Sequence, residues 1–509
     1  MAATQEFFDH IQEGYTTKGD AITLGAAMLH GVPITNALVT VPLKTLNRHG
    51  LIAGATGTGK TKTLQVLAEN LSEKGIPVLL MDMKGDLSGI AKPSPGHAKI
   101  DERHEKIGIP FTSKKFPVEI LTLSEQQGVR LRATVSEFGP VLLSRILDVS
   151  DTQAGIISVI FKYCDDNALP LLDLKDFKKI LQYATNEGKD EFSEAYGRIS
   201  PASTGAILRR VVELEQQGGD IFFGEKSFDT DDLLRIADDG RGYINIVRLT
   251  DIQDRPKLFS TFMLSLLAEI YTTFPEQGDS DRPELVIFID EAHLIFNEAS
   301  DALLDQIESI VKLIRSKGVG LYFVTQNPTD VPDAVLSQLG LKVQHALRAF
   351  TAKDRKAIKL TAENYPISEY YKTDEVLTSL GIGEALVSAL NEKGIPTPLA
   401  ATLLRAPMSR MDVLEEGELE TLLDNSALIK KYNETIDRES AYELLNEKIE
   451  TAQREEAKEK AQREKKAVGR STTSRSRRSA RAPQNPFIKA LSSPTVIRSV
   501  LGILTKLIR

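Results

Sequence analysis

The chain has 509 residues, of which 41% are hydrophobic and 26% are charged, a composition typical of a globular protein that buries its own core without disulfide bonds or a structural metal. Its single cysteine, Cys164, excludes an internal disulfide bond, and its seven scattered histidines form no zinc-ligand pattern. The sequence contains neither an 18-residue apolar stretch nor a signal-peptide pattern, so we expect a cytoplasmic protein with no integral membrane segment.

The formal net charge of −8 is unevenly distributed along the chain. Residues 463–509 contain twelve basic side chains and one acidic one, Glu464, a charge of +11, which leaves −19 on residues 1–462. Because the body is acidic, we expect any polyanion to bind only locally. The basic segment could bind DNA phosphates through counterion release, or it could serve as a flexible tether.

Strand and helix patterns alternate in the first part of the chain. The apolar run Leu51–Ala55 predicts a buried strand, Thr61–Gly75 has apolar residues at helical spacing, and Pro77–Gly85 predicts a second strand. A strand, a helix and a strand in this order form a βαβ unit, which implies a parallel sheet.

The pattern changes in the middle of the chain. From about residue 139 to 240 the apolar periodicity is helical, which predicts an α-helical insertion. Strands resume at Gly242–Leu249, Leu285–Asp290 and Val319–Gln326, so we expect the insertion to lie within one sheet domain. From about Asp437 a charged helix is expected, followed by a Ser- and Arg-rich segment whose lack of large apolar residues predicts disorder.

A phosphate-binding loop is predicted at residues 54–61, GATGTGKT, which fits the pattern G-x-x-x-x-G-K-[ST] between a predicted strand and a predicted helix. The glycines let successive backbone N–H groups surround phosphate oxygens, and the helix N-terminus adds its positive dipole end. Lys60 is expected to reach the β- and γ-phosphates of ATP, and the Thr61 hydroxyl to bind Mg²⁺. The candidate nucleotide-binding residues of this loop are Gly54, Thr56, Gly57, Thr58, Gly59, Lys60 and Thr61.

Two adjacent acids, Asp290 and Glu291, end the apolar run that begins at Leu285. Such a pair is costly at the tip of a buried strand unless a cation is present. We expect Asp290 to hold the metal and Glu291 to orient and deprotonate the attacking water. An exposed acidic strand end is the alternative, but the phosphate loop in the same chain favours the catalytic interpretation. An adjacent catalytic glutamate indicates hydrolysis rather than phosphoryl transfer to a metabolite.

Gln326 ends the next predicted strand. A polar side chain there would lie beside the γ-phosphate and sense its presence. The alternative is a polar strand end in the turn before Asn327 and Pro328. His293 is expected to support the loop that follows the acid pair.

Four motifs together resemble the HerA–FtsK superfamily of P-loop ATPases, and the HerA-like branch in particular. They are GATGTGKT at 54–61, DMKGDL at 82–87, LVIFIDEAH at 285–293 and RSKGVGLYFVTQNP at 315–328. The resemblance implies a RecA-like sheet in a hexameric ring that pumps double-stranded DNA with ATP. Typical HerA helicases carry about a hundred residues of β-barrel before the phosphate loop, whereas about fifty residues precede it here, which leaves docking of a nuclease partner unsupported.

The resemblance also assigns roles to residues. Lys60 and Thr61 would bind phosphate and Mg²⁺, Asp290 and Glu291 would be the metal and catalytic acids, and Gln326 would be the sensor. Asp82 and Asp86 lie where relatives have an acidic loop beside the nucleotide. Relatives use arginines of the neighbouring subunit to stabilise charge on the transferring phosphoryl group; Arg315 and Arg348 are the candidates here, and each could instead be a surface or salt-bridging arginine.

We therefore expect an α/β fold: a RecA-like P-loop NTPase sheet with an α-helical insertion and a helical, partly disordered C-terminal extension. The predicted divisions are a short N-terminal segment (1–45), the first part of the ATPase core (46–138), the insertion (139–240), the second part of the core (241–410), a charged helical extension (411–468), a basic disordered linker (469–488) and an amphipathic terminal helix (489–509). For that terminal helix we favour docking on protein over binding to an anionic membrane.

The expected function is Mg²⁺-dependent ATP hydrolysis at the subunit interfaces of a hexameric ring, coupled to movement on DNA. ATP and Mg²⁺ are the expected cofactors; further copies of the chain and DNA are the expected partners, with a nuclease or other protein partner unidentified. Two alternatives stay open: a motor for a protein cargo, and a nucleotide-switched scaffold with little turnover. Glu291 argues against the scaffold.

Overall fold

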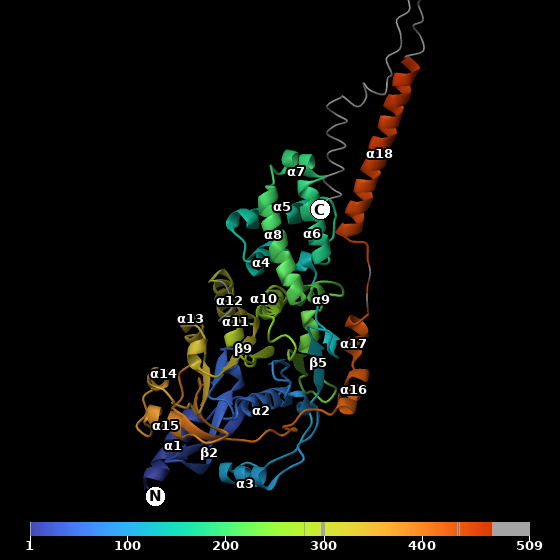
Figure 1. Cartoon of the computed structure of the whole chain (residues 1–509). Coiled ribbons are helices and arrows are strands. Elements are labelled where there is room, and N and C mark those ends of the chain that lie inside the picture. Colours follow the sequence, from blue (N-terminus) through green and yellow to red (C-terminus); the bar gives the residue numbers. More distant parts are fainter. Residues whose placement is uncertain (1, 279, 297–300, 435, 437, 471–509) are drawn as a thin grey trace, which may run out of the picture. The chain divides into compact units, whose positions relative to one another are not determined.

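The computed structural model of the chain describes residues 2–278, 280–296, 301–434, 436 and 438–470 (Figure 1). The basic linker and the terminal helix predicted for 469–509 therefore lie almost entirely outside the described residues. Residues 1–446 form one compact unit and residues 447–509 a second. The finer division of the chain stays a prediction.

Within the described residues, twelve strands form one sheet. In spatial order they are β2 (Val32–Pro42), β1 (Ala21–Leu29), β12 (Ala400–Leu404), β11 (Glu384–Ser388), β10 (Leu341–His345), β3 (Gly50–Ala53), β9 (Val319–Thr325), β8 (Leu285–Ile289), β4 (Val78–Asp82), β7 (Ile244–Arg248), β5 (Val118–Thr122) and β6 (Val129–Arg130). Neighbours from β10 to β6 are parallel, and those from β2 to β10 are antiparallel. The RecA-like α/β fold predicted from the sequence is confirmed.

The parallel strands are apolar along almost their whole length. Every residue of β3, β4, β8 and β9 is buried, as expected where helices cover both faces of a parallel sheet. The order β3-β9-β8-β4 places β9 between the strand before the phosphate loop and the strand before the acid pair. All parallel strands carry their C-terminal ends at one edge, so the predicted functional residues that follow β3, β4, β8 and β9 share that edge.

Helix α2 (Lys60–Glu73) follows β3 after a loop of residues 54–59 and contacts β1, β3, β4 and β7. It ends in a turn in which Ile76 donates a backbone hydrogen bond to Leu71 and Gly75 has a φ of 70°, the left-handed conformation that glycine tolerates at helix ends. The remaining helices of the core are α10 (Pro256–Thr273), α11 (His293–Phe296), α12 (Asp301–Ile314), α13 (Asp333–Leu336), α14 (Ala352–Glu363) and α15 (Thr373–Ser379).

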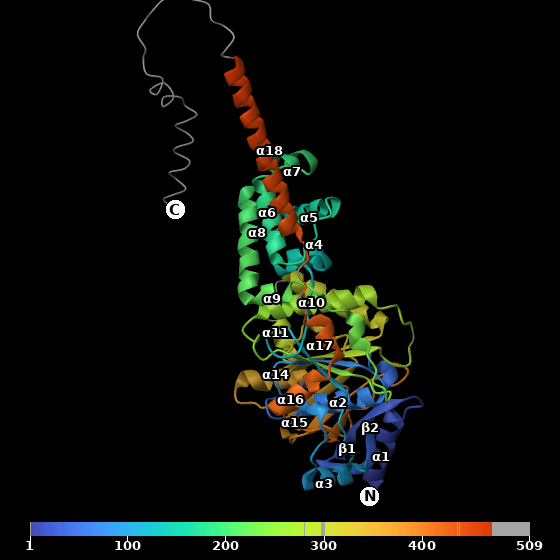
Figure 2. The same ribbon diagram turned by 90° about the vertical axis from the view of Figure 1, so that its right-hand side faces the viewer.

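The insertion between β6 and β7 is helical, as predicted. It comprises α4 (Val135–Ile146), α5 (Asp151–Asp166), α6 (Leu174–Thr185), α7 (Lys189–Ala195), α8 (Pro201–Leu214), a π-helical turn (Glu215–Gly219) and α9 (Asp220–Phe222). Within the insertion, α4 contacts α5, α5 contacts α6, and α8 contacts both α5 and α6 (Figures 1 and 2). Helix α6 buries Phe177, Ile180, Leu181 and Ala184, a spacing that places them on one face.

Residues 2–45 contribute two strands, β1 and β2, to the same sheet. Helix α1 (Ala2–Tyr15) buries Phe7, Ile11 and Tyr15 and contacts β2, and β1 pairs with both β2 and β12. Helix α3 (Ala98–Ile107) contacts β2.

The charged C-terminal extension is helical, as predicted, with α16 (Glu416–Asp424), α17 (Ala427–Tyr432) and α18 (Ala441–Arg470). In the described part of the chain, the helices fall short of the length and apolar character needed to span a bilayer.

Candidate active site

The phosphate loop joins β3 to α2. Gly54, Gly57 and Gly59 have φ values of 150°, 77° and 110°, which are unfavourable for residues with a Cβ atom. A Cβ at Gly54 would lie 2.5 Å from the Cβ of His345, so this position also requires glycine for space. Helix α2 has neither a side-chain cap nor an acidic residue in its first turn, so its N-terminal amides are left to an anion.

Backbone hydrogen bonds hold this loop to the ends of three strands. The amide of Gly54 donates to Thr325 at 3.3 Å, and that of Ala55 donates to Ala346 at 2.9 Å. The amide of Gly383 donates to the carbonyl of Thr58 at 3.0 Å. The loop is therefore positioned by β9, β10 and β11 together.

Lys60 turns its side chain back over the loop. Its Nζ donates to the carbonyl oxygens of Gly54 at 2.7 Å and Ala55 at 3.2 Å. Burial and the nearby Lys84 lower the pKa of Lys60, whereas Glu291 and Asp290 raise it. These residues fit a nucleoside triphosphate, because the Lys60 ammonium and uncapped backbone amides meet at one loop of positive-φ glycines and can bind its phosphates.

The acid pair follows β8 directly. Asp290 is 5% exposed, and burial raises its pKa to about 6, opposed by Lys84 and supported by Glu291. Glu291 has a φ of 48°, a left-handed conformation that is uncommon for residues other than glycine and that occurs often at functional sites. The backbone amide of Ala292 donates to Val324 of β9 at 3.0 Å, which holds this turn against the sensor strand.

Lys84 contacts both acids, a relationship that the sequence did not reveal. Its Nζ lies 2.7 Å from Oε1 of Glu291 and 3.7 Å from Oδ2 of Asp290. On the other side of Glu291, Nδ1 of His293 lies 3.3 Å from Oε2, in line with the supporting role predicted for this histidine. The available signal was a lysine between two acids in DMKGDL, directly after a strongly apolar strand.

Asp82 organises the loop that carries Lys84. Its carboxylate accepts hydrogen bonds from the amides of Gly85 at 2.7 Å, Asp86 at 3.2 Å and Leu87 at 3.2 Å. Burial and the neighbouring Asp86 raise the pKa of Asp82 to about 6. Here the carboxylate serves its own loop, and its contact with nucleotide stays a prediction.

Thr56, Gln326 and Arg348 line one cavity of about 170 Å³ beside the phosphate loop. Arg348 donates from Nη1 to the carbonyl of Thr378 at 3.0 Å. The structure thus places Gln326, the predicted sensor, beside the phosphate loop. It also places Arg348 beside the phosphate loop of its own chain.

Arg315 lies elsewhere, in a 3₁₀ turn (Arg315–Lys317) that precedes β9. It lines another cavity, of about 360 Å³, together with Lys44, Arg48 and Lys312. Because β9 is parallel to β3, the start of β9 is at the opposite edge of the sheet from the phosphate loop. Arg315 therefore does not reach the phosphate loop of its own chain, and its action on a neighbouring subunit stays a prediction.

The predicted metal ligands are Thr61, in the first turn of α2, and Asp290. Among the residues that the structure describes, no three or more His, Cys, Asp or Glu side chains are grouped to hold a metal ion. A hydroxyl and one carboxylate still fit Mg²⁺, which usually takes one or two protein ligands beside phosphate oxygens and water. Such a site would form only with the nucleotide.

His345 is a further residue that sequence reasoning missed. Its Nε2 lies 2.9 Å from Oγ1 of Thr63 in α2, and burial, with a contribution from Lys60, lowers its pKa to about 4. The neutral ring fixes α2 against the end of β10. No local signal marks this histidine in the sequence.

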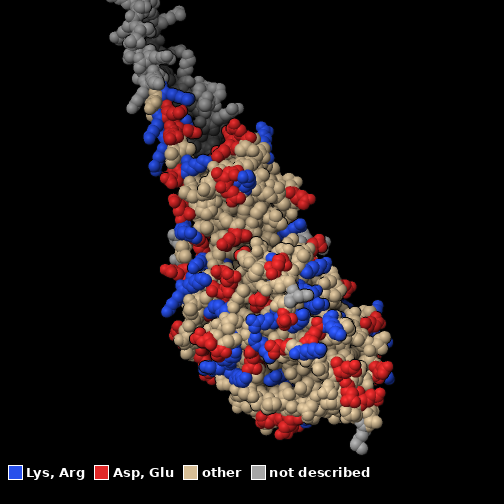
Figure 3. All heavy atoms as spheres, turned by 180° about the vertical axis from the view of Figure 1, so that it is seen from behind, with Lys and Arg blue, Asp and Glu red and all other residues tan. Residues whose placement is uncertain are grey.

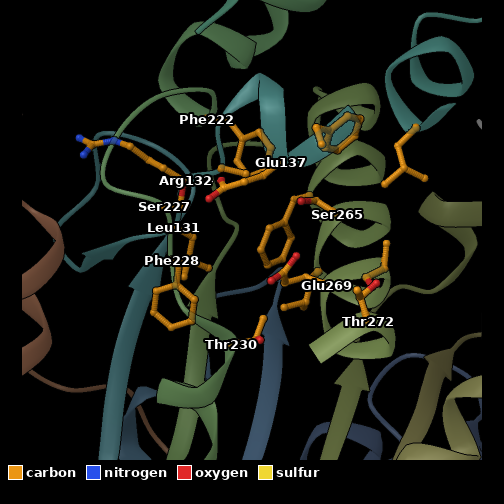
Figure 4. A pocket seen from close by; sticks show the side chains of 16 residues that line it. Leu131, Arg132, Glu137, Phe222, Ser227, Phe228, Thr230, Ser265, Glu269 and Thr272 are labelled. Atoms are coloured by element: carbon orange, nitrogen blue, oxygen red, sulfur yellow. Dashed lines mark hydrogen bonds between the residues drawn. The ribbon is translucent and has the colours of Figure 1, made fainter. Parts of the chain in front are cut away.

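A separate cavity of about 220 Å³ lies between the insertion and α10 (Figure 4). The carboxylates of Glu137 and Glu269 stand there among the rings of Phe222 and Phe228 (Figure 4). Burial and the charge of Glu137 raise the pKa of Glu269. None of the predicted site residues lines this cavity.

Comparisons with known proteins find helicases of similar sequence. The DNA double-strand break repair helicase HerA of Sulfolobus acidocaldarius is 22% identical over 390 residues, 74% of this chain and 69% of that protein. HerA of Saccharolobus solfataricus is 23% identical over 360 residues, 69% of this chain and 64% of that protein. The match to this second relative thus spans less than two thirds of that protein.

Solved structures share the fold. The bacterial conjugative coupling protein TrwB superimposes with a TM-score of 0.53 at 16% identity, covering 80% of this chain and 95% of that one. TrwB in complex with ADP and Mg²⁺ superimposes with a TM-score of 0.51 at 15% identity, covering 80% of this chain and 94% of that one.

A family model described as Helicase HerA-like C-terminal matches residues 28–509. Because this match covers nearly the whole chain, the chain belongs to the helicase HerA-like C-terminal family and is a P-loop ATPase of the HerA–FtsK superfamily.

Proposed function

We propose that the chain hydrolyses ATP with Mg²⁺ and uses the energy to move double-stranded DNA through a hexameric ring, as a translocase or helicase. The observation that carries this proposal is the sheet order β3-β9-β8. It places Lys60, Gln326 and the acid pair at the ends of neighbouring strands, where one triphosphate can meet all of them.

Each residue has a separate task in hydrolysis. Lys60 leaves the carbonyls of Gly54 and Ala55 and binds the β- and γ-phosphates. Glu291 orients the attacking water and takes its proton, while Gln326 contacts the γ-phosphate from β9. Thr61 and Asp290 would hold Mg²⁺, which would supply positive charge to neutralise the phosphates.

The ring accounts for the position of Arg315. A cation at the amino edge of β9 can stabilise charge only on a nucleotide bound to another copy of the chain. Arg348 instead lines the cavity beside its own phosphate loop. We therefore assign the trans contact to Arg315 and a contact within the same chain to Arg348.

DNA is the favoured cargo because HerA of Sulfolobus acidocaldarius is named as a DNA double-strand break repair helicase and TrwB as a conjugative coupling protein. Basic and acidic side chains are interspersed over the face shown in Figure 3. On such a surface DNA would be held at a few loops in a pore rather than along a broad basic stripe.

The test is ATP turnover with and without double-stranded DNA, measured on the wild type, on Glu291→Gln and on Glu102→Gln. Glu102 is 62% exposed and pairs with Lys106 in α3, so its variant is a matched control that should turn over like the wild type. We expect DNA to stimulate the wild type and the control several-fold, and Glu291→Gln to lose at least about 100-fold in kcat.

Two other results would point elsewhere. Wild-type ATP turnover that is the same with and without DNA would favour a protein cargo over DNA. Equal, slow turnover in the wild type and Glu291→Gln would contradict catalysis by Glu291 and leave the nucleotide-switched scaffold.

A further inference from the structure

We propose that Lys84 is a positioning residue that acts as a built-in counter-cation: its ammonium holds Asp290 and Glu291 together until Mg²⁺ with its nucleotide replaces it. Glu291 is thereby released for catalysis only in a loaded site. This inference rests on the proposed ATPase function, and it concerns a residue to which that proposal gives no role.

The geometry places one cation against two carboxylates. Nζ of Lys84 lies 2.7 Å from Oε1 of Glu291, a hydrogen-bonded ion pair, and 3.7 Å from Oδ2 of Asp290. The side chains of Asp290 and Glu291 are only 7% and 12% exposed, whereas that of Lys84 is 40% exposed. The lysine therefore approaches a buried pair from the solvent side, and its long side chain can withdraw to that side.

Hydrogen bonds hold the backbone of the loop that carries Lys84. Asp82 accepts hydrogen bonds from three successive amides, those of Gly85, Asp86 and Leu87. Gly85 has a φ of 75°, which shapes this turn. The loop thus presents the lysine to the acid pair at a constant distance, while four methylene groups let the ammonium depart.

Electrostatics require a cation at this place. Two adjacent carboxylates removed from water are strongly destabilised unless a positive charge compensates them. Lys60 also carries positive charge near the pair, but its Nζ is engaged by the carbonyls of Gly54 and Ala55. On the far side of Glu291, His293 stands 3.3 Å away. Lys84 is the cation in direct ion-pair contact with both acids.

Mg²⁺ and the ammonium exclude each other. A divalent ion beside Asp290 would repel a lysine that lies 3.7 Å from the same carboxylate. Binding of Mg²⁺ with nucleotide would therefore weaken the hold of Lys84 on the pair and favour its release from Glu291. Oε1 of Glu291, which the ion pair occupies, is then free to accept a hydrogen bond from the attacking water; Oε2 has no hydrogen-bond partner among the described residues.

Removal of Lys84 should convert the acid pair into a metal site that needs no nucleotide. The experiment measures Mn²⁺ binding by electron paramagnetic resonance, without nucleotide, to the wild type, Lys84→Met, Lys84→Arg and Lys74→Met. Lys74 is 38% exposed, close to the 40% of Lys84, but it pairs with Asp20, whose side chain is 71% exposed, so its variant is the matched control. Mn²⁺ serves as the probe because it accepts the same oxygen ligands as Mg²⁺.

We expect Lys84→Met to bind Mn²⁺ at least about 10-fold more tightly than the wild type, a difference of about 1.4 kcal/mol. Lys84→Arg and Lys74→Met should bind it like the wild type. The concentration of Mg²⁺ that gives half-maximal ATP turnover should fall in Lys84→Met alone. Equal Mn²⁺ affinity in the wild type and a folded Lys84→Met would overturn the proposal.

Folding itself provides a second test if Lys84→Met is too unstable to study. Because the instability would come from two uncompensated carboxylates, the double variant Lys84→Met/Glu291→Gln should fold again, and failure of both variants to fold would overturn the proposal. The Mn²⁺ measurement does not depend on DNA or on turnover. A wild type that DNA fails to stimulate would therefore count against the proposed motor without changing the result for Lys84.

Discussion

The backbone amide of Leu321 donates a hydrogen bond to Nδ1 of His49 at 3.0 Å, which links the residue before β3 to the middle of β9. Nε2 of the same ring lies 2.8 Å from the carbonyl of Val311 and donates to it. Both nitrogens are satisfied only in the neutral ring, since a proton on Nδ1 would face the Leu321 amide. Burial lowers the pKa of His49 to about 4, opposed by the Val311 hydrogen bond and supported by Arg315.

This buried histidine should make stability depend on pH. Between pH 6.5 and about 4 the unfolded chain takes up a proton at His49 that the folded chain does not, so the free energy of unfolding falls as the pH falls through this window. The full effect of this site is about 3 kcal/mol. The free energy of unfolding, measured by urea denaturation at several pH values, should change less steeply with pH in His49→Gln than in the wild type.

The wild type is compared with a variant that differs only at position 49, because other buried groups titrate in the same pH range. The pKa of His345 is also lowered to about 4 and acts in the same direction. The pKa values of Asp82 and Asp290 are raised to about 6. Their protonation therefore raises the free energy of unfolding as the pH falls, opposite to the effect of the histidines. Identical slopes in the wild type and His49→Gln would contradict the assignment.

Glu69 should anchor the segment that follows β12. Its buried carboxylate accepts hydrogen bonds from the amides of Met408 at 2.6 Å and Ser409 at 3.0 Å, and from the Ser409 hydroxyl. An amide at this position would accept at one atom only, so Glu69→Gln should lower the free energy of unfolding by about 2 kcal/mol.

The control for Glu69 is Glu73, one turn further along α2. Glu73 pairs with Lys114 and is 28% exposed, so Glu73→Gln should cost less than about 1 kcal/mol. Urea denaturation of the two variants measures the difference. A cost for Glu69→Gln no larger than that for Glu73→Gln would show that the carboxylate is not an anchor.

Two glycines of the phosphate loop should respond differently to alanine. At Gly54 a Cβ would lie 2.5 Å from the Cβ of His345, whereas at Gly57 it would meet nothing within 4 Å. Both positions have positive φ, so each substitution costs about 1–2 kcal/mol in backbone strain. Gly54→Ala should in addition displace the loop and abolish binding of a fluorescent ATP analogue, while Gly57→Ala should weaken it about 10-fold. Equal losses would argue against the contact with His345 as the constraint.

Mixed rings should distinguish the two arginines. If Arg315 acts on the neighbouring subunit, a mixture of Arg315→Ala with Glu291→Gln recovers turnover, because some interfaces then pair an intact Glu291 with an intact Arg315. A mixture of Arg348→Ala with Glu291→Gln should stay inactive, because Arg348 serves its own chain. ATP turnover at several mixing ratios gives the answer, and recovery in the second mixture would exchange the two roles.

The sequence was informative where function depends on contiguous residues. The loop at 54–61 and the acids at 290–291 carry patterns that predict both the local fold and the chemistry. Their strands and the helix α2 lie where the periodicity predicted them. The helical insertion was also predicted, since amphipathic spacing is a local property.

Relationships between distant residues were not predictable in this way. β1 pairs with β12 across more than 370 residues of sequence, and no pattern within residues 1–45 predicted this pairing. Lys84 and Glu291 are more than 200 residues apart, and the same is true of Thr63 and His345. Such contacts depend on the sheet order, which no single segment of the sequence specifies.

The most direct measurement is a structure of the protein with Mg²⁺ and a non-hydrolysable ATP analogue. We expect Nζ of Lys60 to leave the carbonyls of Gly54 and Ala55 and to lie about 3 Å from the β- and γ-phosphate oxygens. The carboxylate of Glu291 should face the terminal phosphate across a single water molecule. Phosphates bound away from residues 54–61, or Glu291 turned away from the terminal phosphate, would contradict the account.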